Sequence, residues 1–223
     1  MKTKTLLLAL VLVFSTASFA QFKIPKSPFG GGGDDDKQEQ SSRDITQIQA
    51  ELLNDVAEAL SAVTEAQALI ADAQGNAEKA AQLRNTSETL KGGANRDEAI
   101  QGAVQTVKET AEEQQAVFSA SESMSTESKG LYAKALLPYV KSVAKTVMLK
   151  DPVQDFLKEA KNEIKSIKNP MQIRKMQKSL NTGMFIGQNV PVLIGSLAKS
   201  STDLLSFAKS NDLDTSEASS MEL

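Results

Sequence analysis

The sequence predicts an all-α protein in which a long antiparallel helical hairpin with heptad spacing precedes a smaller helical bundle. Three observations lead to this prediction. Apolar side chains recur alternately every four and three positions, which is the spacing of one helix face. Glycine pairs and Asn-Pro or Asp-Pro steps mark helix ends. No stretch alternates apolar and polar residues as a half-buried strand does, and the chain has no cysteine for disulfides, so its stability must come from helix packing.

The first 20 residues have the pattern of a secretory signal peptide. Lys2 and Lys4 form a basic start, an apolar run follows at positions 6–14, and small residues lead up to Ala20. The run is too short to cross a bilayer, which takes roughly 20 apolar residues. We therefore expect cleavage between Ala20 and Gln21 and a periplasmic or secreted product.

Residues 21–43 are expected to form a flexible tether, because four consecutive glycines at positions 30–33 precede three aspartates. Ordering such a run costs much backbone entropy. An alternative is a docking peptide, in which the apolar Phe22, Ile24 and Phe29 engage a partner.

Residues 44–129 are expected to form the acidic hairpin. Its first helix carries a heptad seam and is expected to continue to about residue 91, with Gly75 tolerated within it at a cost of about 1 kcal/mol. Gly92 and Gly93 end that helix, and Asn95 restarts the next. The first seam is Leu52, Val56, Ala59, Val63, Ala66, Ile70, Ala73, Ala77 and Ala80, and the second is Ile100, Val104, Val107, Ala111, Gln114, Phe118 and Ser121.

Residues 130–210 are expected to form the smaller, basic bundle. Its helices are predicted over 131–149, with a kink or break at Pro138, then from Asp151-Pro152 to Lys168, briefly after Asn169-Pro170, and over 184–210. Proline at the first helical position fits a helix start. Residues 211–223, rich in Asp, Ser and Glu, are predicted to be a disordered tail.

Charge is divided between the two parts of the chain. Residues 34–128 hold 19 acidic and 7 basic side chains, a net charge of −12, whereas residues 129–210 hold 5 and 14, a net charge of +9. In one interpretation the basic helices fold against the acidic hairpin and the charges cancel there. In the other, a basic amphipathic helix faces an anionic surface such as lipid headgroups. The candidate contacts are Lys158, Lys161, Lys165, Lys168, Arg174, Lys175 and Lys178.

One segment, residues 179–198, has no charged side chain. Its glycines at four-residue spacing allow close helix contact, so the segment is expected to be the buried centre of the bundle. Alternatives are insertion into a membrane or the lining of an apolar ligand cavity. The candidate residues are Gly183, Phe185, Gly187, Pro191 and Gly195.

The chain has no histidine and no cysteine, which excludes Ser-His-Asp and Cys-His nucleophilic sites and the usual zinc ligand sets. No phosphate-binding glycine motif and no basic surface interleaved with aromatic residues is present. We expect a non-catalytic protein without cofactor or metal that does not bind nucleic acid. Its expected role is structural or in protein interaction, through an unknown partner or self-association of the heptad helices. The alternative is a lipid- or membrane-associating protein or a carrier of an apolar ligand.

Overall fold

The computed structural model describes residues 44–93, 95–120 and 125–221, so the predicted signal peptide and tether lie outside the described residues. The described residues form helices and no strand, which confirms the all-α class. The helices are α1 (Ile45–Ala73), α2 (Ala77–Gly92), α3 (Arg96–Ala120), α4 (Thr126–Val147), α5 (Lys150–Ser166), α6 (Pro170–Ser179), α7 (Asn181–Ser210) and α8 (Ser216–Ser219).

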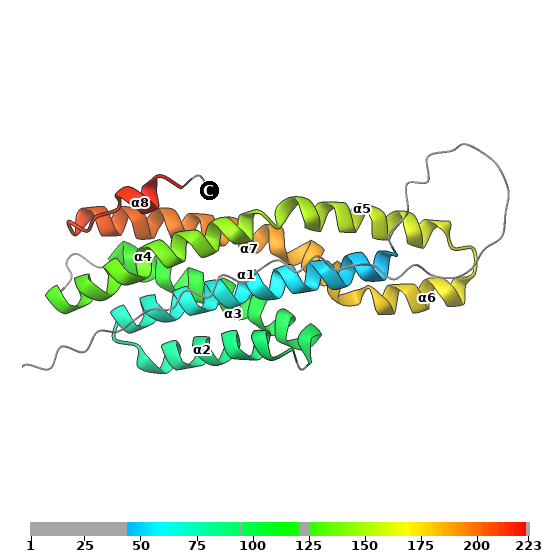
Figure 1. Ribbon diagram of the computed structural model, residues 1–223, viewed down its shortest axis with the longest axis horizontal. Helices are drawn as coiled ribbons and strands as arrows, with labels where there is room; N and C mark the ends of the chain where they lie inside the picture. The colour runs from blue at the N-terminus through cyan, green and yellow to red at the C-terminus, as the bar shows by residue number, and fades with distance from the viewer. Residues whose placement is uncertain (1–43, 94, 121–124, 222–223) are drawn as a thin grey trace, which may run out of the picture. The chain divides into compact units, whose positions relative to one another are not determined.

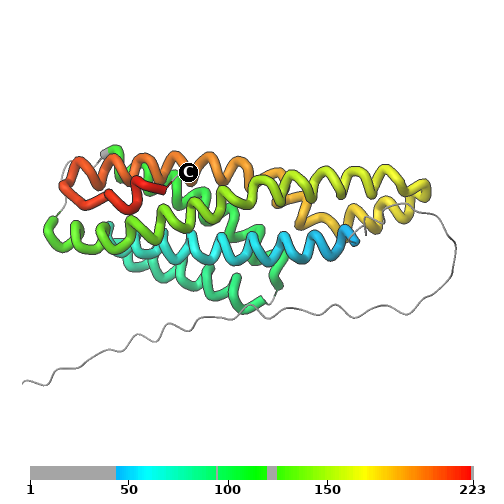
Figure 2. Tube along the Cα trace, turned by 45° about the horizontal axis from the view of Figure 1, so that its top comes forward, coloured from blue at the N-terminus to red at the C-terminus, as the bar shows by residue number. Residues whose placement is uncertain are grey.

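Four helices, α1, α3, α4 and α7, surround the core within residues 42–223. α1 packs on α3 and α4, and α7 packs on the same two helices from the other side. α2 lies outside this group against α1 and α3, and α5 continues from α4 along α7 and α1. Figures 1 and 2 show that α1, α3 and α7 run in one direction, whereas α4 and α5 run in the opposite direction.

The predicted seams form the interior of this bundle. Val56, Val63 and Ile70 in α1 are fully buried, as are Ile100 and Val107 in α3. Alanines at the intervening seam positions of α1 let neighbouring helices approach it. At the described seam positions the heptad spacing therefore identified the buried faces correctly, with one exception: Ala77 is exposed. Ser121, the last predicted seam position, lies outside the described residues.

The predicted first hairpin helix, residues 44–91, is wrong because the chain turns back at Gly75. That glycine has φ +75°, a conformation that other residues rarely adopt, and Asn76 N–H donates to Ala71 O at 2.9 Å, as in a glycine-terminated helix end. Asn76 then caps α2 by accepting from Lys79 N–H at 3.1 Å. The helix that follows α1 and turns back antiparallel against it is thus α2, whereas α3 runs parallel to α1 (Figure 1).

The division into an acidic hairpin and a separate basic bundle is also not what the structure has. One hydrophobic core runs from Ile45 in α1 to Ala218 in α8, and every described helix except α6 contributes a buried side chain to it; α2 contributes Leu90. The half-buried Met176 of α6 packs against this core. The predicted disordered tail is wrong for residues 211–221, because Asn211, Thr215 and Ala218 are buried and α8 packs on α4. The polar composition of this segment predicted disorder, because only a few of its residues are buried.

The helices of the second half start and end close to the predicted positions. Asn169 accepts a hydrogen bond from Met171 N–H at 2.9 Å, and Pro170 is the first residue of α6, as predicted. α4, however, begins before Gly130, at Thr126, and continues through Pro138 without a break. Figures 1 and 2 show that the α5–α6 turn extends beyond the start of α1 at one end of the bundle.

Candidate functional site

The seven predicted anionic-surface contacts gather at the α5–α6 end. α5 forms because Val153, Phe156 and Ala160, spaced by three and four residues, bury one face against α7 and α1. The lysines of α5 lie on its remaining surface, and the other predicted cations belong to the turn that follows and to α6. All seven are exposed: Lys158, Lys161 and Lys165 in α5, Lys168 in the turn, and Arg174, Lys175 and Lys178 in α6.

None of these seven cations forms an ion pair with another described residue. The ion pairs in the described part of the chain lie elsewhere, for example between Lys79 and Glu113 at 2.8 Å. Among the described residues, only the pair of Lys145 in α4 with Glu58 in α1 joins the basic part of the chain to the acidic part. The seven cations are therefore left without an ion pair to any residue that the structure describes, although α5 also carries four acidic residues, Asp151, Asp155, Glu159 and Glu163.

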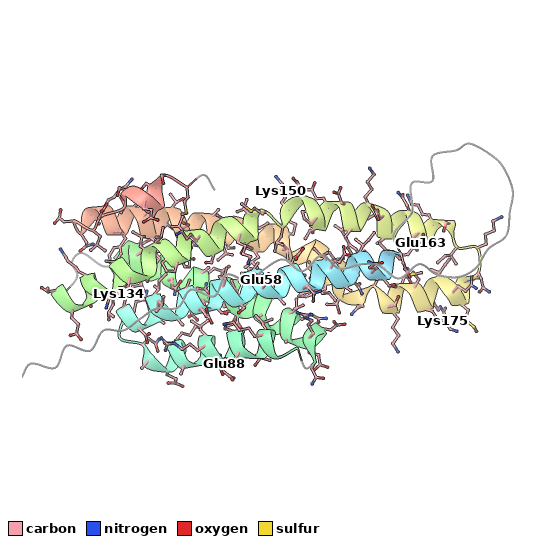
Figure 3. The ribbon with its side chains drawn as sticks, in the orientation of Figure 1. Glu58, Glu88, Lys134, Lys150, Glu163 and Lys175 are labelled. Atoms are coloured by element: carbon pink, nitrogen blue, oxygen red, sulfur yellow. The ribbon has the colours of Figure 1, made fainter. Side chains whose placement is uncertain are left out.

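The cations do not share one flat surface. Figure 3 shows Lys150 on the outer edge of α5, Glu163 on its inner edge, and Lys175 on the outer edge of α6, on the opposite side of the molecule. Lys161 follows Lys150 by eleven residues, or three helical turns, and so lies on the same outer side. The charge therefore surrounds the end of the bundle, and α6 presents a basic face of its own.

That face of α6 contains an apolar residue that the sequence analysis did not single out. Met171 is 71% exposed, and Arg174, Lys175 and Lys178 follow it at three, four and seven residues, which places all four on one helix face. Ile173 and Met176, on the other side, are half-buried, and no residue of α6 is fully buried. We call Met171, Arg174, Lys175 and Lys178 the α6 face.

Of the predicted close-packing residues in α7, two make close contact with a neighbouring helix. A Cβ atom at Gly183 would lie 2.4 Å from Phe156 Cζ, and one at Gly187 would lie 2.3 Å from Leu157 Cδ2, so both glycines make room for α5. A Cβ atom at Gly195 would have no atom within 4 Å apart from the backbone of its own helix and its chain neighbours. Phe185 is half-buried, and Pro191 and Gly195 are exposed.

The apolar ligand cavity lined by this segment stays a prediction, because the pocket described in the structure has other lining residues. A pocket of about 290 Å³ lies between α1 and α4 instead, lined among others by Ala62, Leu69, Pro138 and Lys145. Within the described residues every helix is too short or too polar to cross a membrane. The described residues also contain no group of three or more His, Cys, Asp or Glu side chains placed to hold a metal ion.

A buried polar layer crosses the core and was not found from the sequence. Gln67 Nε2 donates to Val107 O at 3.0 Å, Gln114 Nε2 donates to Gln67 O at 3.1 Å, and Tyr139 OH donates to Ser200 Oγ at 2.9 Å. Burial raises the pKa of Tyr139 to about 12, although its hydrogen bonds act in the opposite direction. Because this hydroxyl is sealed from solvent, the layer ties helices together and is not placed to act on a substrate.

Comparison with known proteins gives no relative for this chain: no protein-family model, no curated protein and no solved structure matches it.

Proposed function

We propose that the chain is an exported, non-catalytic binding protein that contacts an anionic partner through its α5–α6 end. The observation that carries this proposal is the set of seven exposed cations that form no ion pair with another described residue. Burying such charges against a partner is favourable only where the partner supplies the opposite charge. A partner with acidic or phosphate groups meets that requirement.

Three further features support this role. The pattern of residues 1–20 favours export. The lack of histidine and cysteine removes the common nucleophilic sites. Gly183 and Gly187 let α5 pack closely against α7, so the basic end is joined to the packed core.

Lysine footprinting tests the proposal in the native setting. The rate of acetylation of each lysine is measured by mass spectrometry in the envelope or secreted fraction of the producing cell, and again in the purified, processed chain. We expect slower acetylation in the native fraction at Lys158, Lys161, Lys165, Lys168, Lys175 and Lys178.

Lys134, Lys199 and Lys209 are the matched reference residues. They are exposed, form no ion pair with a described residue, and belong to α4 and α7. Their rates should not change between the two preparations. Equal rates at the α5–α6 lysines in both preparations would contradict the proposal, and so would uniform protection of all lysines.

A further inference from the structure

We infer that the anionic partner of this end is the surface of an anionic phospholipid bilayer, and that the α6 face is the part that enters it. The inference rests on the proposed function and goes further, because it names the partner and the residues. It starts from the exposed Met171 among three cations.

The arrangement of the α6 face suits a bilayer interface. Its four residues recur at i, i+3, i+4 and i+7, so they form one line along the helix. A helix lying in the plane of the interface directs such a line toward the acyl chains. Met171 then reaches the apolar boundary, while Arg174, Lys175 and Lys178 bury their aliphatic stems and keep their charges among the phosphates.

The surroundings of α6 favour a bilayer over an acidic protein surface. An exposed methionine in line with three cations on one helix face needs an apolar layer beneath a charged one, which a bilayer provides over its whole area. No acidic residue occurs between Glu163 and Asp203 to repel anionic headgroups, and Glu163 lies on the inner edge of α5 (Figure 3).

The packing of α6 allows this contact without unfolding the bundle. No α6 residue is fully buried, and among the described helices it contacts only its neighbours α5 and α7 to a substantial extent. Its end is held by the buried Leu180 and by Gln49 Nε2, which donates to Ser179 O at 2.9 Å. The face opposite these attachments is therefore presented while the core stays closed.

Binding to lipid vesicles tests the inference with the processed chain. The vesicles contain phosphatidylglycerol and phosphatidylcholine in equal parts, or phosphatidylcholine alone, and bound protein is measured by co-sedimentation at low and high salt. We expect binding only to the anionic vesicles, and less of it at high salt. A failure to co-sediment with the anionic vesicles at low salt overturns the inference.

Matched variants separate the α6 face from net charge alone. The triple variant Arg174→Gln, Lys175→Gln, Lys178→Gln should bind anionic vesicles about 100-fold more weakly, at about fivefold for each cation near the surface. The control triple Lys134→Gln, Lys199→Gln, Lys209→Gln removes the same charge from α4 and α7 and should bind nearly as the parent does. Equal losses in the two triples would show that only net charge matters and would overturn the inference.

Insertion of Met171 has its own readout, because the chain contains no tryptophan. Met171→Trp should give emission that shifts to the blue when anionic vesicles are added and that is quenched by brominated acyl chains. Met148→Trp is the matched control, since Met148 is 75% exposed and lies between α4 and α5; its emission should not shift. An unshifted signal from Met171→Trp on bound vesicles contradicts the inferred orientation.

Circular dichroism on every variant confirms that the helices are intact. If footprinting shows protection of the α5–α6 lysines in the native fraction but the chain does not bind anionic vesicles, the partner is an acidic protein. In that case the proposed function stands and the bilayer inference fails. If footprinting shows no protection, the proposed function fails by itself.

Discussion

Replacing Gly183 with alanine should destabilise the fold through a single added methyl group. Gly183 lies in α7 where it passes α5 and α1, and an ideal Cβ there would be 2.4 Å from Phe156 Cζ and 2.6 Å from Gln49 Oε1. Neither neighbour can move cheaply. Phe156 is fully buried, and Gln49 is held by hydrogen bonds to Ser179 O and to Gly183 N–H, at 2.9 and 3.2 Å.

Two opposing contributions determine the size of the effect. Overpacking a well-filled core costs about 1–3 kcal/mol, whereas alanine in place of glycine within a helix gains about 1 kcal/mol. Gly195→Ala in the same helix should show only the gain in helix propensity and no cost of overpacking, because the added Cβ has no packing neighbour within 4 Å. The difference in the free energy of unfolding between the two variants should therefore be about 1–3 kcal/mol, with Gly183→Ala the less stable.

Urea denaturation followed by circular dichroism measures this difference. The midpoint of Gly195→Ala should rise above that of the parent, and the midpoint of Gly183→Ala should fall below that of Gly195→Ala with an unchanged m value. If Gly183→Ala is as stable as Gly195→Ala, then α5 does not pack on this glycine and the reasoning is refuted.

Three further predictions concern the turn, the polar layer and the C-terminal segment. Gly75→Ala should lower the free energy of unfolding by about 1 kcal/mol, because φ is +75° there; thermal denaturation showing a more stable variant would contradict this. Tyr139 has a pKa of about 12 in the fold and about 10 when unfolded, so it contributes stability below pH 10 that is lost as the pH rises to 12, about 3 kcal/mol in all. In Tyr139→Phe, the free energy of unfolding measured by urea titration should fall less between pH 10 and pH 12 than in the parent. An equal fall in the variant and the parent would argue against burial of the hydroxyl. Ala218→Glu should release residues 211–221 from α4 and speed their hydrogen exchange, whereas exchange as slow as in the parent would show that this contact does not hold the segment.

The burial pattern was the most predictable part of the fold. Val56, Val63 and Ile70 recur at helix spacing, and an apolar stripe of that kind has to be covered by other helices. Burial follows from spacing because the hydrophobic effect is not directional. The spacing does not determine which helix covers the stripe. The packing of α2 and α4 against α1 could therefore not be predicted in the same way.

The turn at Gly75 shows where helix propensity alone misleads. A glycine costs about 1 kcal/mol in a helix, which packing can offset, so the spacing of Ala73 and Ala80 favoured one continuous helix. Asn76 was the residue that could have predicted the turn. A glycine that ends one helix and an asparagine that caps the next predict a helix break more strongly together than either does alone. The tail was missed for a similar reason, since Ala218 and Thr215 bury within a polar stretch.

The basic character of the candidate site was visible in the sequence, but its geometry was not. Summing the charge of α5 and α6 treats their cations as one group, whereas Lys150 and Lys175 lie on opposite sides (Figure 3). The signal that could have identified the α6 face is Met171, because it precedes Arg174 and Lys178 by three and seven residues. A single apolar residue among cations does not predict a binding face until the opposite side of the helix is known to be packed.

The direction of α3 relative to α1 depends on buried polar side chains, which heptad spacing does not predict. A seam of valine and alanine packs equally well against a parallel or an antiparallel neighbour, but a buried amide needs a donor or acceptor at one particular place. Gln67 reaches Val107 O, and Gln114 reaches Gln67 O, so the two amides pair α1 with α3 at two successive levels. Reversing α3 would leave both amides buried without these partners, at about 1–3 kcal/mol for each. Gln114, a polar residue in a mostly apolar seam, is thus one of the residues that selects the parallel arrangement over the simple hairpin.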